Sequence, residues 1–267
     1  MPIYGTSKNN NTTYGDTNTI ITNQNKDTAS SHTVTIEAKD KDDKVEVTLK
    51  DVNIDTSSRN KAAVSVTGEG DTNIKLDGDN ALKSDIYRSG IYGSGSLTIS
   101  GGENDSLTAQ GGSGANGISS SGSLTISGGT VTANGDDGGR GISSSGSVTI
   151  SGGSTVTANG GSGTISGGDG IWSGGGVTIS GGSTVTANGG NGGSLVGGDG
   201  IRSGGGLTVS DGTVTAKGGN GDSKDGYGGD GIRSGGVVTI SGNTVNAAGG
   251  YGGKVGGYGI CSFDRVA

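Results

Sequence analysis

The chain has 267 residues, of which 63 are glycine and only 27% are hydrophobic, and its formal net charge is −7. So low an apolar content is typical of disordered chains, while the single proline and the lack of a strict glycine period exclude collagen. The acidic balance argues against nucleic acid as a partner, and the single cysteine, Cys261, excludes an intrachain disulfide and a thiolate zinc cluster.

Residues 1–30 are polar and rich in asparagine and threonine. We interpret them as a flexible start that leads into a cap, because the first coil of a stacked structure needs a cover. The first residues do not have the composition of a signal peptide, and no run approaches the roughly 18 apolar residues of a membrane helix. The sequence therefore predicts no transmembrane segment and leaves the export route open.

Residues 31–89 contain short runs in which apolar and polar side chains alternate, for example at 33–37 and 44–49. Such alternation is typical of half-buried strands. These runs carry more charge and less glycine than the sequence that follows, and no linker separates the two parts. We therefore interpret residues 31–89 as irregular early coils of the domain that continues through residues 90–267.

From residue 90 onward the chain repeats one unit, which reads GISSSGSVTISGGSTVTANG at residues 141–160. Its leading Gly-Ile recurs at intervals of 24 to 31 residues, at Gly90, Gly117, Gly141, Gly170, Gly200, Gly231 and Gly259. A period of this size indicates a solenoid, a propeller or an array. The unit is too short for a propeller blade of four strands and about 40 residues, but its three β-prone runs fit one coil of a parallel β-helix.

Each unit offers a few small apolar side chains on the inward side of its alternating runs. In the unit above these are Ile142, Val148, Ile150, Val156 and Ala158. One coil cannot bury them alone, whereas stacked coils form a continuous narrow core. The sequence thus predicts one all-β domain, a right-handed parallel β-helix over residues 31–267 with three short strands per coil, its hand following from the preference of parallel crossovers. Phe263 and Val266 are expected to help cover the C-terminal end.

Stacking turns equivalent positions of the repeat into columns on the surface. The residues that precede each Gly-Ile form the corner column, which consists of Ser89, Asn116, Arg140, Asp169, Asp199, Asp230 and Tyr258. Aspartates about 4.8 Å apart repel one another by about 1 kcal/mol per pair in water-like surroundings. Two explanations stay open: each aspartate caps a turn by accepting backbone N–H groups, or the repulsion between Asp169, Asp199 and Asp230 is offset, by a bound cation such as Ca²⁺ or by Arg202 and Arg233 nearby.

The residues that follow each Gly-Ile form the strand column, which consists of Tyr92, Ser119, Ser143, Trp172, Arg202, Arg233 and Cys261. Alternation directs these side chains outward. An exposed tryptophan beside two arginines suits a carboxylated ligand, because guanidinium groups bind carboxylates through two parallel hydrogen bonds. The candidate ligand-binding residues are therefore Trp172, Arg202, Arg233 and Tyr92. The alternative is that Trp172 merely packs on Arg202 through a cation–π contact.

Enzyme signatures are mostly absent from the sequence. The only histidine, His32, lies far from most coils, so that a Ser-His-Asp triad is not supported. Glycine strings such as 189–193 lack the Gly-Lys-Ser/Thr ending and the following helix of a phosphate-binding loop. No catalytic residue is therefore predicted.

A third column, Asn134, Asn159 and Asn188, predicts a structural ladder of amide hydrogen bonds.

Three stretches of the chain carry a family resemblance: VTLKDVNID at residues 47–55, GIYGSGSLTISGG from Gly90, and the repeated Thr-Val-Thr-Ala-Asn-Gly-Gly. Together they resemble the carbohydrate-binding parallel β-helix proteins, over roughly residues 45–260. The resemblance implies the architecture of the pectate-lyase-like superfamily. It also implies a non-catalytic bacterial protein, outside the cell or on its surface, that binds acidic, pectin-like polysaccharide with bound calcium.

The sequence supports three functions from different classes. The leading one is a carbohydrate-binding protein that is secreted or held at the cell surface, with polysaccharide as partner and Ca²⁺ as cofactor. The second is a structural or adhesive solenoid, such as an adhesin, that associates end to end. The third is a polysaccharide lyase, in which Arg202 or Arg233 would act as an exposed base near calcium held by Asp199 and Asp230.

Overall fold

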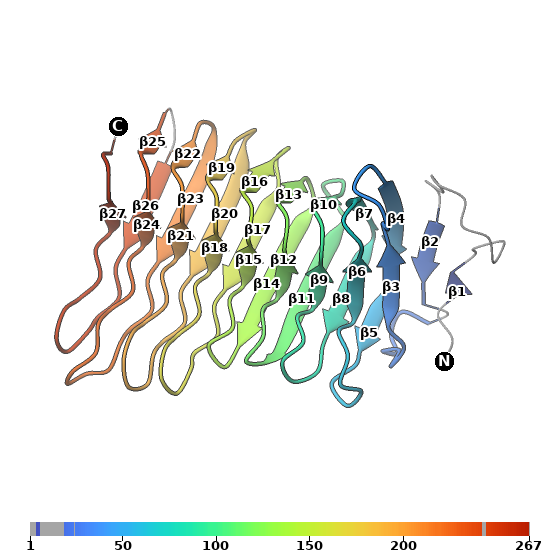
Figure 1. The fold of residues 1–267 in the computed structure, drawn as a ribbon, viewed down its shortest axis with the longest axis horizontal. Helices are drawn as coiled ribbons and strands as arrows, with labels where there is room; N and C mark the ends of the chain where they lie inside the picture. Colours follow the sequence, from blue (N-terminus) through green and yellow to red (C-terminus); the bar gives the residue numbers. More distant parts are fainter. Residues whose placement is uncertain (1–3, 6–18, 24, 242–243, 267) are drawn as a thin grey trace.

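The computed structural model describes residues 4–5, 19–23, 25–241 and 244–266, and within these ranges all regular elements are β-strands. The strands form a β-solenoid in which three sheets run along the length of the molecule (Figure 1). Each regular coil contributes one strand to each sheet. The predicted parallel β-helix with three short strands per coil is thereby confirmed.

Sheet A has ten strands among the described residues. They are β1 (Tyr4–Gly5), β2 (Thr19–Thr22), β4 (Lys44–Lys50), β7 (Asp71–Asp77), β10 (Leu97–Ser100), β13 (Leu124–Ser127), β16 (Val148–Ser151), β19 (Val177–Ile179), β22 (Leu207–Val209) and β25 (Val238–Ile240). Strand β2 pairs in parallel with β4, while β1 pairs with β2 in the antiparallel sense. Sheet A therefore begins inside the segment 1–30, for which the sequence predicts a flexible start and a cap. Most of that segment lies outside the described residues.

Sheets B and C complete each coil. The described strands of sheet B are β5 (Asn53–Asp55), β8 (Asp79–Lys83), β11 (Ser106–Ser113), β14 (Thr130–Asp136), β17 (Thr155–Asn159), β20 (Ser183–Asn188), β23 (Gly212–Lys217) and β26 (Thr244–Ala248). Those of sheet C are β3 (Val34–Glu37), β6 (Val64–Thr67), β9 (Ile91–Gly93), β12 (Ile118–Ser120), β15 (Ile142–Ser144), β18 (Ile171–Ser173), β21 (Ile201–Ser203), β24 (Ile232–Ser234) and β27 (Ile260–Ser262). Both sheets run without a break from the early coils into the regular ones.

The inward side chains form one continuous core. All five inward positions predicted for residues 141–160 are at most 1% exposed, and the equivalent residues of neighbouring coils pair with them in parallel register. The core consists largely of isoleucine, valine, leucine and alanine, one layer per coil. Stacking thus buries apolar groups that a single coil would leave in water.

The last coil differs from the expectation at its end. Phe263 is 68% exposed and Val266 is 56% exposed, so the expected cover over the core is wrong. The reason is that the ring of Phe263 lies beside the outward side chain of Arg233, with the guanidinium carbon 5.4 Å from the ring centre. Ile260 and Val245 of this coil are accordingly only partly buried.

Long glycine-rich connections from sheet B to sheet C extend side by side along the lower edge of the molecule in Figure 1. Their backbones are joined by hydrogen bonds: Gly168 N–H donates to the Gly161 carbonyl (2.9 Å), Gly190 to Gly168 (2.8 Å) and Gly198 to Gly190 (2.8 Å). The series continues through Gly219, Gly229, Gly250 and Gly257. The connections are therefore a hydrogen-bonded wall and not a set of independent loops.

This wall requires glycine because the backbones approach too closely for a Cβ atom. A Cβ on Gly198 would stand 1.9 Å from the carbonyl oxygen of Gly168, whereas a Cβ on Gly256 would have its nearest neighbour 3.5 Å away. We therefore expect Gly198→Ala to lower the free energy of unfolding by about 1–3 kcal/mol, as overpacking does. Gly256→Ala is the matched control and should leave it within about 0.5 kcal/mol of wild type. Urea denaturation measures both, and equal stabilities for the two variants would contradict the close-packed wall.

Candidate functional site

The corner column lies where the glycine wall meets sheet C, and its aspartates cap the backbone of the following coil. The Oδ1 atom of Asp169 accepts the backbone N–H of Asp199 (2.9 Å), and that of Asp199 accepts the N–H of Asp230 (2.7 Å). Asp230 caps Tyr258 in the same way, and Asn116 caps Arg140. Capping, one of the two explanations left open by the sequence, is therefore present in this column.

The three aspartates are buried, each being 5–7% exposed, and they do not share their charge partners equally. The Nε atom of Arg140 lies 3.3 Å from Asp169, and Arg233 lies 3.9 Å from Asp230. Asp199 stands between the other two carboxylates. Burial raises its pKa to about 6; the N–H of Asp230 opposes this shift, and the charges of Asp169 and Asp230 add to it. Asp199 is thus the one aspartate of the column that has no ion pair among the described residues.

The strand column is in the predicted register. Trp172 of β18 pairs with Arg202 of β21, which pairs with Arg233 of β24. The alternative left open by the sequence, a cation–π contact between Trp172 and Arg202, is wrong, however. The guanidinium carbon of Arg140 lies 4.5 Å from the centre of the Trp172 ring, so the residue that covers the half-buried indole comes from the corner column. Arg140 reaches across to the next coil, where it contacts Trp172 and Asp169 together.

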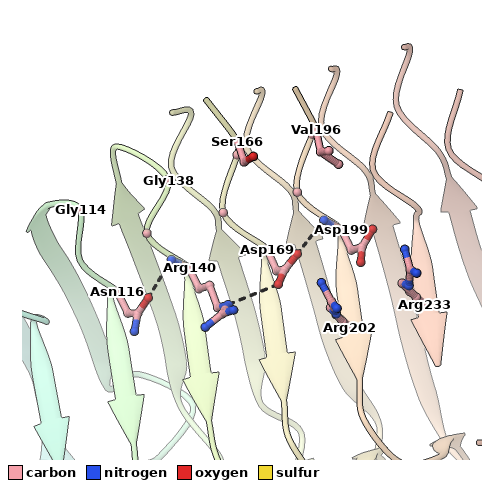
Figure 2. Close-up of a pocket in the computed structure, with 15 residues that line it drawn as sticks. Gly114, Asn116, Gly138, Arg140, Ser166, Asp169, Val196, Asp199, Arg202 and Arg233 are labelled. Atoms are coloured by element: carbon pink, nitrogen blue, oxygen red, sulfur yellow. Dashed lines mark hydrogen bonds and ion pairs between the residues drawn. The ribbon is translucent and has the colours of Figure 1, made fainter. Parts of the chain in front are cut away.

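Parts of these two columns form the floor of a groove of about 490 Å³, which we call the arginine groove (Figure 2). Trp172 is not among the residues that line it. Its other side is the glycine wall, including Gly138, Ser166 and Val196. Arg140, Arg202 and Arg233 all line it. Arg202 is exposed, and among the described residues no ion pair or ring contact occupies its guanidinium group. One unneutralised cation therefore faces the open groove, between carboxylates that are already engaged in caps.

Tyr92 does not join this group. It belongs to the same column but is separated from Trp172 by Ser119 and Ser143, three coil steps along the axis. At about 4.8 Å per step this is roughly 14 Å. Tyr92 is 41% exposed and lines a different groove. Of the sequence-predicted ligand residues, Arg202 and Arg233 thus line the arginine groove, Tyr92 lines another groove, and Trp172 lines neither.

Two further columns are structural. Asn188 donates its amide N–H to Asn159, and Asn159 donates to Asn134, both at 2.8 Å, which confirms the predicted ladder. A serine ladder was not predicted: the buried hydroxyl of Ser173 donates to the Gly146 carbonyl of the preceding coil (2.9 Å). Equivalent bonds are made by Ser120, Ser144, Ser203, Ser234 and Ser262. The signal was present in the sequence as the serine of Gly-Ile-x-Ser.

Metal binding by Asp169, Asp199 and Asp230 stays a prediction. The described part of the chain contains no group of three or more histidine, cysteine or carboxylate side chains that could hold a metal ion. One oxygen of each aspartate already accepts a backbone N–H.

Within the described ranges, no helix has the length and apolar character needed to cross a membrane.

A family model described as "Carbohydrate-binding domain-containing protein" matches residues 17–251, which include the glycine wall as far as Gly250 and both columns except their last members, Tyr258 and Cys261. The chain belongs to this family. No curated protein and no solved structure matches it. Family membership indicates carbohydrate binding and suggests a binding protein, not an enzyme. The arginine groove lies within the matched region and is the candidate site on this member of the carbohydrate-binding family.

The buried charge of Asp199 makes stability depend on pH. Its pKa is higher in the folded chain (about 6) than its ordinary value of 3.8, so folding favours the protonated form. The contribution of the protonated Asp199 to the free energy of unfolding is therefore fully present below about pH 4 and is lost as the pH rises through 6. The loss amounts to about 3 kcal/mol at most. We expect Asp199→Asn, which keeps an oxygen for capping as Asn116 does, to be more stable than wild type above pH 6 and similar to it at pH 4.

Urea denaturation between pH 4 and 8 measures this difference. Asp169→Asn is the control: because Asp169 pairs with Arg140, its neutralisation should bring no gain at high pH. The calcium hypothesis predicts the reverse, namely that a chelator lowers the melting temperature of the wild type and that Asp199→Asn is destabilised at neutral pH. A wild type that is insensitive to chelator, with a stabilised variant, would exclude a cation shared by this column.

Proposed function

We propose that this protein is a non-catalytic, extracellular binder of acidic polysaccharide, with carboxylated sugar residues held in the arginine groove. The observation that carries the proposal is the exposed guanidinium group of Arg202, which has no partner among the described residues and lines the groove between Asp199 and Arg233. A guanidinium group offers a carboxylate two parallel N–H donors in a fixed plane. Membership in the carbohydrate-binding family supports the class of ligand.

The neighbouring groups favour recognition of a sugar over that of a small anion. Arg140 is held in place by Asp169 and by the ring of Trp172, so that little side-chain entropy is lost when it contacts a ligand. The glycine wall adds peptide groups along the open side of the groove. Binding sites of this type combine a shaped concave surface with a few fixed polar groups. The groove also runs past several coils, which suits a chain-like ligand.

The charge of the whole protein does not prevent this binding. The net charge of −7 repels a polyanion at long range. That repulsion is screened beyond about 8 Å at physiological ionic strength, whereas a guanidinium–carboxylate contact acts at hydrogen-bond distance. Added salt should therefore weaken two interactions: the long-range repulsion between the protein and a polyanion, and the direct contact between a guanidinium group and a carboxylate. Recognition depends on the local cations and not on the overall field.

A polysaccharide lyase is the enzymatic alternative, and Arg202 is the exposed base that it would use. The buried aspartates beside it are engaged in caps and in pairs with Arg140 and Arg233, which favours binding without reaction. Incubation with polygalacturonate and calcium, followed at the absorbance of unsaturated products, tests this. We expect no product above the level of a boiled sample, and sustained product formation that disappears in Arg202→Ala would establish the lyase.

A structural or adhesive role has one supporting observation. The apolar residues Ile240, Val245, Ala247 and Ile260 of the last coil are only partly buried, whereas their equivalents in the inner coils are fully buried. Apolar surface and strand edges of this kind favour association with another β-structure. Light scattering across a range of protein concentrations detects end-to-end association, for which growth of the particle with concentration is the expected sign. A constant monomer would exclude it.

The arginine groove gives a direct mutational test. We expect Arg202→Ala to raise the Kd for an oligogalacturonide by at least about tenfold. A hydrogen bond to a charged group contributes about 1.5–3 kcal/mol to the free energy of binding. The melting temperature should not change, since the side chain is exposed and forms no ion pair with any residue that the structure describes. Lys75→Ala removes an exposed cation from strand β7 of sheet A and is the control. Calorimetric titration that shows equal losses for both variants would contradict a local site at Arg202.

A further inference from the structure

A second groove, of about 680 Å³, lies on the same side of the solenoid near the early coils. We call it the tyrosine groove. Its floor is the early part of the strand column, extended back through Ser65 and Thr35 of strands β6 and β3. Its lining residues are Thr33, Thr35, Asn60, Lys61, Ala62, Ser65, Tyr87, Arg88, Ser89, Tyr92 and Ser119. It therefore combines two aromatic rings, two cations and several hydroxyl groups.

Tyr87 is held in an unfavourable backbone conformation that presents its ring to solvent. Its φ angle is +58°, a left-handed value that costs a non-glycine residue about 1–2 kcal/mol, and its side chain is 76% exposed. Its N–H donates to the Ser113 carbonyl (2.9 Å). The ring edge lies so close to Gly114 that a Cβ there would stand 2.9 Å from the Cδ1 and Cε1 atoms. An exposed aromatic ring in a strained position is not explained by packing.

The tyrosine groove and the arginine groove adjoin each other. Asn116 lines the arginine groove and Ser119 lines the tyrosine groove, although both belong to the same coil. Gly114, against which the Tyr87 ring lies, is itself part of the arginine groove. Ser89 and Asn116, consecutive members of the corner column, lie one in each groove. The two grooves are thus successive parts of one surface along the corner between the wall and sheet C.

We infer that the tyrosine groove is a second subsite for the same polysaccharide chain, and this inference rests on the proposed function. The rings of Tyr87 and Tyr92 offer apolar faces on which the C–H face of a sugar ring can stack. Lys61 and Arg88 are exposed, and neither forms an ion pair with another described residue, so both can meet sugar carboxylates. Tyr92 and Arg202 are four coil steps, or roughly 19 Å, apart. A chain of several sugar residues is needed to occupy both subsites.

Occupation of two subsites by one chain raises affinity because the second contact is intramolecular. We expect the wild type to bind a long oligogalacturonide at least about tenfold more tightly than galacturonic acid trisaccharide, in calorimetric titrations. The double variant Tyr87→Asn, Tyr92→Ala should lose most of this gain, while its affinity for trisaccharide in the arginine groove changes less than about twofold. Asparagine is chosen at position 87 because it tolerates the left-handed conformation.

Tyr251→Ala is the matched control, since Tyr251 is 61% exposed but lines neither groove. Thermal unfolding shows that all variants are folded. If the double variant keeps the full affinity for the long oligosaccharide, the second subsite is wrong while the arginine groove stands. If neither oligosaccharide binds to the wild type, the proposed function itself fails. Loss of long-chain affinity in the double variant, with Tyr251→Ala unchanged, supports one binding surface across both grooves.

Discussion

Backbone hydrogen bonds between successive coils hold equivalent residues of the repeat beside one another. Ile142, Ile171 and Ile201, for example, follow each other in strict parallel register although they are 29 and 30 residues apart in the chain. Each added coil contributes a layer to the core and one member to every surface column. The chemistry of the surface is therefore set by single positions of the repeat and is multiplied along the axis.

Register also creates a difficulty, because it places like groups beside like groups. Asparagines and serines benefit, since each side chain can donate to the coil before it. Aspartates do not, and the corner column offsets their repulsion by capping and by interleaved arginines. Asp169 and Asp230 have arginines within 4 Å, while Asp199 accepts the N–H of Asp230 and forms no ion pair with another described residue. The residue at this position differs from coil to coil, from Asn116 through Arg140 to the three aspartates. These differences set where charge is exposed and where it is neutralised.

The fold and the columns were predictable because period and alternation are explicit in the sequence. Val148 and Ile150 had to point inward, and Trp172, Arg202 and Arg233 had to lie in one column. The contact of Arg140 with Trp172 was not predictable, because a long side chain crosses from one column and one coil to the next, and its direction follows from the position of Asp169. The separation of Tyr92 from Trp172 followed from the register. That the two lie in different grooves depended on the glycine wall, whose folding no local pattern indicates.

Glycine-rich segments on a protein surface are usually where proteases cut and where amide hydrogens exchange with water quickly. We expect the wall described above to reduce both weaknesses. Its peptide N–H groups at Gly168, Gly190, Gly198 and Gly219 are bonded to neighbouring carbonyls, and a protease needs an extended segment that it can pull away from such partners. A chain that is almost one quarter glycine (63 of 267 residues) can therefore hold its glycine-rich connections in one arrangement. Its most flexible residue type is used where the backbone is most tightly held.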